Sequence, residues 1–149
     1  MKPEVEICRF LDAHISDVWT AITDKTWMKQ WYFDLQEFKP EVGFTFEFVG
    51  GPEDGIQYHH ICVVTEVIFE KKLAYSWKYA GYEGISYVTF LLSDVDGKTR
   101  LDFSHSGIST FPITNPDFAL HNFEAGWDHF IQHALPEFLS ELLKSNKSK

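Results

Sequence analysis

The sequence predicts an α+β domain in which an antiparallel sheet of about six or seven strands packs one face against a C-terminal helix. Two observations predict it. Segments in the middle of the chain alternate apolar and polar residues, and a segment near the C-terminus repeats apolar residues at helical spacing. The length of 149 residues fits one domain over residues 1–149. Hydrophobic residues make up 44% of the chain and aromatic residues 17%. So much bulky apolar surface needs either a large core or a pocket that it lines.

The chain begins with a predicted strand over 5–10 and two short helices. Ser16 is expected to cap the first helix and Asp24 the second. Helices this short are not stable alone in water, so they must dock on the rest of the protein. Their docking surface is rich in indole rings, which either close the end of a cavity or complete a solid core: Trp19, Trp27 and Trp31.

The middle of the chain predicts the remaining strands. Alternation with a period of two marks strands over 43–49, 57–68, 73–79, 86–92 and 99–105, preceded by a shorter strand over 33–38. The pair Asp96-Gly97 predicts a hairpin turn between the last two strands. Short connections of this kind make the sheet antiparallel, with one face covered.

The C-terminal segment predicts the helix that covers this face. Asn115 is a candidate cap, Pro116 suits the first helical position, and apolar residues recur at helical spacing over 123–142. Pro136 should kink or divide the helix, because proline lacks the backbone N–H. Gly126 is expected to permit a close approach of the helix backbone.

In this order the segments resemble the START-like, or Bet v 1-like (SRPBCC), superfamily, and within it the branch of activator of heat shock protein 90 ATPase homologues. The resemblance covers roughly residues 5–143 and rests on VWTAITD (18–24), VGFTFEF (42–48), LAYSW (73–77), YVTFLL (87–92), TRLDFSHSG (99–107) and GW (126–127). It implies a helix-grip fold, in which a curved antiparallel sheet wraps around the long C-terminal helix. The two short helices would then close one end of the sheet.

The leading hypothesis is a binding module that holds a small apolar or aromatic ligand in a cavity between the sheet and the C-terminal helix. Aromatic and histidine side chains expected to point inward are the candidate ligand-binding residues: Phe44, Phe46, Phe48, His59, Tyr75, Trp77, Phe90, Phe103, His105 and Trp127. The histidines either orient a ligand or act as packed core residues. The core role is favoured, because no partnered nucleophile is visible in the sequence.

Two other function classes stay open. The resemblance suggests a co-chaperone-like protein-interaction domain that binds a chaperone or another protein. A cyclase- or hydrolase-type enzyme using the same cavity is a further alternative, although no residue is identified as catalytic.

Charge, histidine spacing and the length of the apolar runs argue against nucleic acid, metal and membrane as partners. A formal net charge of −9 disfavours nucleic acid. His129 and His133 are one helical turn apart, but no third ligand is evident, and neither a metal nor a cofactor is expected. No apolar run is long enough for membrane insertion. Together with two cysteines that are expected to be free and buried, this predicts a cytoplasmic protein.

Overall fold

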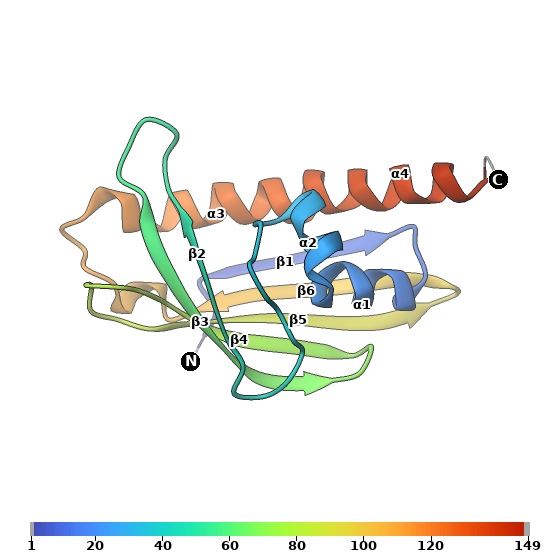
Figure 1. Cartoon of the computed structure of the whole chain (residues 1–149), viewed down its shortest axis with the longest axis horizontal. Helices are drawn as coiled ribbons and strands as arrows, with labels where there is room; N and C mark the ends of the chain where they lie inside the picture. Colours follow the sequence, from blue (N-terminus) through green and yellow to red (C-terminus); the bar gives the residue numbers. More distant parts are fainter. Residues whose placement is uncertain (1, 148–149) are drawn as a thin grey trace.

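The computed structural model describes residues 2–147 and has the helix-grip architecture. A curved, six-stranded antiparallel sheet lies against a long C-terminal helix (Figure 1). The order across the sheet is β1-β6-β5-β4-β3-β2, so the first strand pairs with the last. The strands are β1 (Val5–Leu11), β2 (Thr45–Gly50), β3 (Tyr58–Ile68), β4 (Lys72–Tyr79), β5 (Ser86–Val95) and β6 (Lys98–Ser106).

Two short helices follow the first strand, as expected, and pack at one end of the sheet (Figure 1). They are α1 (Ile15–Thr23) and α2 (Lys25–Trp31). Short 3₁₀ turns, η1 (Ile108–Thr110) and η2 (Pro116–Phe118), connect the sheet to the long helix. The long helix has three parts, α3 (Leu120–Asp128), the π-helical segment η3 (His129–Ala134) and α4 (Leu135–Lys147).

The long helix shows how the chain accommodates Pro136. The helix continues through this residue (Figure 1), and the irregularity is the π-helical segment η3, which ends two residues before it. In a regular α-helix the proline ring clashes with the carbonyl four residues earlier, which here belongs to Gln132 inside η3. We expected Pro136 to kink or divide the helix; the helix instead stays continuous and has a wider π turn beside the proline.

Three local predictions were wrong. Residues 33–38 form no strand, because Leu35 and Phe38 are both buried at a spacing of three, which strand alternation does not allow. Ser16 lies inside α1, whose N-cap is His14. Asn115 does cap a helix, but it is the 3₁₀ turn η2. The long helix starts only after Ala119, whose extended backbone separates it from η2.

The predicted hairpin turn between β5 and β6 is confirmed. Asp96 and Gly97 both have positive φ, 53° and 84°, as a tight two-residue turn requires. The Gly97 N–H donates to Oδ1 of Asp94 at 3.0 Å, so a side chain that precedes the turn also stabilises it.

The tryptophans of the two short helices pack into solid core. Trp19 and Trp31 are buried, and Trp27 is partly buried. The Trp31 Nε1–H donates to the carbonyl of Ala21 at 2.8 Å, which joins α2 to α1. Trp27 meets the ring of Phe138 edge-on at 5.6 Å, so α2 also packs on α4. Of the two roles considered for these indoles, the solid core is the one observed.

Asp24 caps α2, as predicted. Its Oδ1 accepts hydrogen bonds from the backbone N–H groups of Thr26 at 2.9 Å and Trp27 at 3.2 Å. We expect Asp24→Ala to lower the free energy of unfolding by about 1 kcal/mol, the usual cost of losing an N-cap side chain. Urea unfolding would measure it, with Asp34→Ala as an exposed control. Equal effects of the two substitutions would contradict the capping role.

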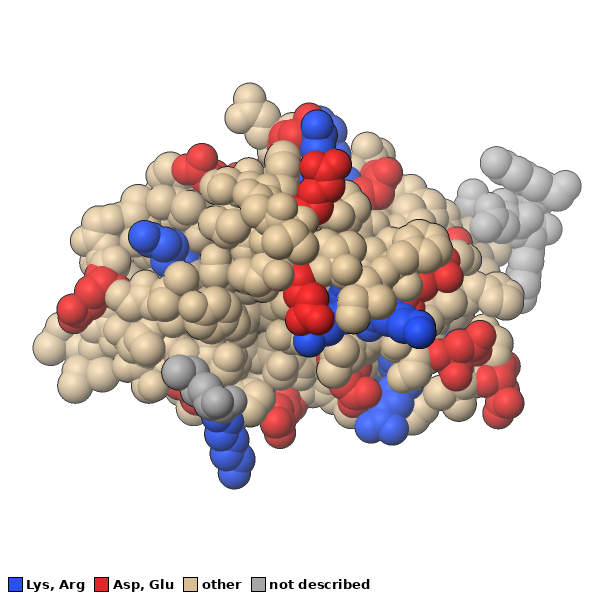
Figure 2. Space-filling view, turned by 90° about the horizontal axis from the view of Figure 1, so that it is seen from below, with Lys and Arg blue, Asp and Glu red and all other residues tan. Residues whose placement is uncertain are grey.

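One face of the molecule carries charges of both signs. On the face seen from below, opposite the long helix, acidic and basic side chains are interspersed (Figure 2). Within residues 2–147, no helix combines the length and apolar character that crossing a membrane requires.

Candidate functional site

A pocket of about 440 Å³ lies where the β2–β3 hairpin and the first turns of α3 face each other. This is the end of the sheet away from α1 and α2 (Figure 1). The exposed residues of its lining, Gly51, Pro52, Asn122 and Gly126, mark the mouth. The remaining lining residues are Phe33, Gly50, Tyr58, His60, Trp77, Tyr79, Asp117, Phe118, Phe123, Trp127 and Phe130.

The inner wall of the pocket is a set of aromatic rings in mutual contact. The ring centroids of Trp77 and Trp127 are 5.7 Å apart, and Tyr79 stacks on Phe118 at 4.6 Å. These rings come from β4, α3 and η2, so three separate segments fix the wall. Interlocked rings of this kind have few alternative rotamers, which keeps the pocket pre-formed.

One side of the pocket carries a closed group of polar side chains. The Tyr58 hydroxyl donates to Oδ2 of Asp117 at 2.6 Å and accepts from Nδ2 of Asn115 at 3.1 Å. The Asn115 Oδ1 in turn accepts from the backbone N–H of Asp117 at 2.9 Å. Burial, together with the hydrogen bond to Asp117, raises the pKa of Tyr58. Asp117 is thus a carboxylate held in a fixed position in the lining.

His60 is the titratable base of the pocket. Its Nδ1 lies 2.9 Å from the carbonyl oxygen of Tyr58, and because a carbonyl only accepts, Nδ1 carries the proton. Nε2 is therefore a lone-pair acceptor. Burial lowers the pKa of His60 to about 4, so the ring is neutral at physiological pH. It stacks on Phe48 at 4.4 Å, which fixes its plane.

His105 supports the pocket wall from behind. Its Nδ1 accepts from the Trp127 Nε1–H at 2.9 Å, and since an indole N–H only donates, the ring is the Nε2–H tautomer. That Nε2–H donates to Oγ of Ser86 at 2.7 Å, and the Ser86 hydroxyl donates to the carbonyl of Trp77. Burial lowers the pKa of His105 to about 3. Both ring nitrogens are bonded to protein, so His105 positions Trp127.

Trp77 contributes a buried donor without a partner. Among residues 2–147, its Nε1–H makes no hydrogen bond of acceptable geometry. An unsatisfied buried N–H costs about 1–3 kcal/mol, and such groups in native structures are often associated with function.

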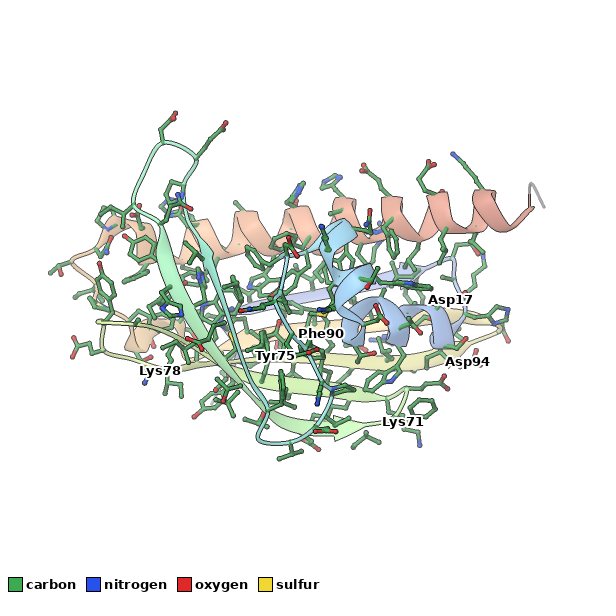
Figure 3. All side chains as sticks on the ribbon, in the orientation of Figure 1. Asp17, Lys71, Tyr75, Lys78, Phe90 and Asp94 are labelled. Carbon is green, nitrogen blue, oxygen red and sulfur yellow. The ribbon has the colours of Figure 1, made fainter. Side chains whose placement is uncertain are left out.

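The structure separates nine of the ten predicted ligand-binding residues into two groups, and His59 belongs to neither. Trp77 and Trp127 line the pocket. Tyr75 and Phe90 lie between the sheet and the helical layer, and both side chains are buried there (Figure 3). The other residues that belong to the core around or below the pocket are Phe44, Phe46, Phe48, Phe103 and His105.

The expected direction of His59 was wrong. Its side chain points outward, is 48% exposed and pairs with Glu47 at 2.6 Å. The neighbouring His60 points inward instead, because it pairs with Phe48 of β2, and directly opposed residues share one face of the sheet. The role expected for Gly126 was also wrong, since a Cβ at this position would meet no atom within 4 Å. Its missing side chain leaves space at the pocket mouth.

The sequence reasoning missed most of the pocket lining. Tyr58, His60, Cys62 and Val64 alternate along β3 and are buried. Because His59 was expected to point inward, this alternation was assigned to the solvent face. That alternation was the available signal. Asp117 and Phe118 lie in η2, and the Asn115-Pro116 pattern indicates a helical turn here but not that the turn lies against the pocket.

Comparisons with known proteins agree with this fold. The family model described as "Activator of Hsp90 ATPase homolog 1-like protein" matches residues 12–140. The solved structure of MLL2253 from Mesorhizobium loti is 26% identical, with a TM-score of 0.73 over 92% of this chain and 96% of that one. A comparison with curated proteins found no match.

Two further solved structures are similar in fold only. CV1439 from Chromobacterium violaceum is 18% identical, with a TM-score of 0.75 over 91% of this chain and 95% of that one. CalU16 from Micromonospora echinospora is 22% identical, with a TM-score of 0.69 over 96% of this chain and 80% of that one.

Proposed function

The chain belongs to the Activator of Hsp90 ATPase homolog 1-like family, and from that premise we propose that it is a binding protein whose pocket takes a small apolar or aromatic ligand. The observation that carries the proposal is the pocket itself, about 440 Å³ in volume and walled by aromatic rings. This size, with few polar groups at fixed positions, is typical of small-molecule sites.

The lining suggests how such a ligand is held. A flat molecule lies against the rings of Trp77 and Trp127, and the lone pair on Nε2 of His60 accepts a hydrogen bond from a ligand donor. The core residues predicted as ligand contacts act indirectly, by holding the wall. His105 is the clearest case, because it bonds Trp127 at 2.9 Å.

Gly126→Leu tests the proposal. We expect the wild type to bind a neutral flat probe, 1-naphthalenemethanol, with micromolar affinity, about −8 kcal/mol. The leucine side chain at the pocket mouth should weaken binding at least about tenfold. The substitution should also stabilise α3, because glycine costs about 1 kcal/mol in a helix interior and a Cβ here meets no atom within 4 Å. Calorimetric titration measures the affinity, and thermal unfolding the stability.

The matched control is Ala125→Leu. It places a leucine at the position directly before Gly126, which is also exposed on α3 but lies outside the pocket lining. It should leave the affinity unchanged within about twofold. No binding by the wild type across neutral, cationic and anionic aromatic probes would refute the proposed function.

A protein-interaction role is the second candidate, and one observation favours it. Four apolar side chains lie exposed on the connections at the pocket end of the sheet: Ile56, Tyr82, Ile85 and Ile113, the last 91% exposed. A chaperone or other protein that docks here would cover them. If the probes fail to bind, this candidate takes first place.

We also propose a cytoplasmic location. Cys8 and Cys62 are both free, and free thiols suit a reducing compartment. Cys62 is buried and Cys8 is exposed, which corrects the expectation that both thiols are buried.

A further inference from the structure

We infer that the pocket selects aromatic ligands that carry a positively charged amine over those that carry a carboxylate; this inference rests on the proposed function. It concerns ligand class, and it follows from the electrostatics of the lining. Asp117 is the only acidic residue among the lining residues, and none of them is a lysine or an arginine.

The position of Asp117 is fixed by the protein. Its Oδ2 accepts from the Tyr58 hydroxyl and its backbone N–H donates to Asn115, so two hydrogen bonds hold the residue at the edge of the aromatic wall. Neither bond neutralises its charge, because both partners are uncharged. A ligand ammonium at the mouth would find a pre-placed counter-charge without ordering a flexible side chain.

The aromatic rings beside Asp117 add to the same preference. The Tyr58 ring lies 5.1 Å from Phe118 and 5.7 Å from Tyr79, which stack on each other. The faces of aromatic rings attract cations, and aromatic walls with a carboxylate nearby favour amines. The same faces repel an anion.

Two further acidic residues lie beside the mouth, since Glu53 and Asp54 are exposed next to Pro52 in the β2–β3 hairpin. His60 is the one lining group that can become positive, and burial keeps its pKa at about 4. A carboxylate ligand, such as a fatty acid, would therefore enter a negative site without a cationic partner.

Three probes with the same ring system test this inference: 1-naphthylmethylamine, 1-naphthalenemethanol and 1-naphthoate. We expect the amine to bind the wild type about fivefold more tightly than the alcohol, and the carboxylate to bind more weakly than the alcohol. Raising the salt concentration from 20 to 400 mM should reduce the preference for the amine, while the affinity for the alcohol stays constant.

Asp117→Asn removes the charge but keeps an oxygen for the Tyr58 hydroxyl. It should reduce the amine-to-alcohol affinity ratio from about fivefold to about twofold or less, because only the contribution of the aromatic rings and the outer acidic residues remains. Asp12→Asn is the control, because it removes one charge from an exposed side chain that is not part of the lining. The salt series on the wild type gives an independent answer if Asp117→Asn fails to fold.

The outcomes separate the two proposals. If the alcohol binds but the amine has no advantage, or the carboxylate binds as tightly, the inference is wrong and the proposed function stands. If no probe binds, both fail. An undiminished preference for the amine in Asp117→Asn would also overturn the inference, since the charge of Asp117 would not be its source.

Discussion

Acidification from pH 7 to pH 4 should lower the free energy of unfolding by about 3 kcal/mol through His105 and by a similar amount through His60. Both rings are buried and neutral in the folded protein, with pKa values lowered to about 3 and about 4 from the ordinary 6.5. The unfolded chain therefore binds protons first as the pH falls. This stability is fully present above about pH 6.5 and is lost progressively below it.

His105→Gln isolates this contribution from that of the carboxylates, which titrate in the same pH range. Glutamine can accept from the Trp127 Nε1–H and donate to Ser86, but it does not titrate. The difference in free energy of unfolding between pH 7 and pH 4, measured with urea, should be about 3 kcal/mol smaller in the variant.

His14→Gln is the matched control, because His14 is exposed and makes no side-chain capping bond. It should leave the pH dependence unchanged. If His105→Gln retains the full acid sensitivity of the wild type, His105 is not the buried neutral ring described above.

Trp31→Ala should lower the free energy of unfolding by about 3–5 kcal/mol. The indole is 4% exposed, it stacks on Tyr32 at 5.0 Å, and its N–H holds α1 through the carbonyl of Ala21. Removing it leaves a cavity between α1, α2 and the long helix, where the backbone cannot collapse without moving all three. Urea unfolding monitored by circular dichroism measures the loss.

Trp27→Ala provides the comparison within the same helix. Trp27 is only partly buried and makes its aromatic contact at the side of α4, so its removal should cost clearly less than that of Trp31. An equal cost for the two would mean that α2 does not dock through Trp31.

The strand pattern shows where sequence reasoning succeeds. Phe46 and Phe48 alternate with Thr45 and Glu47, so only one phase of β2 buries apolar residues, and the structure has that phase. β3 has apolar residues in both phases, and its phase follows from pairing with β2 at Phe48 and His60. A one-residue change of phase moves every side chain of a strand to the other face. For this reason His59 was expected to point inward, whereas the inward residue is His60.

The sequence by itself determined the α+β class, the antiparallel sheet, the two short helices and the covering C-terminal helix, because hydrophobic periodicity and turn residues act locally. It also predicted that Trp77 and Trp127 point inward, and both line the pocket. Only the tertiary structure decided where the core is solid and where a pocket remains. That depends on how η2, α3 and the β2–β3 hairpin meet in space, and no local pattern contains the distance between segments that are joined only by packing.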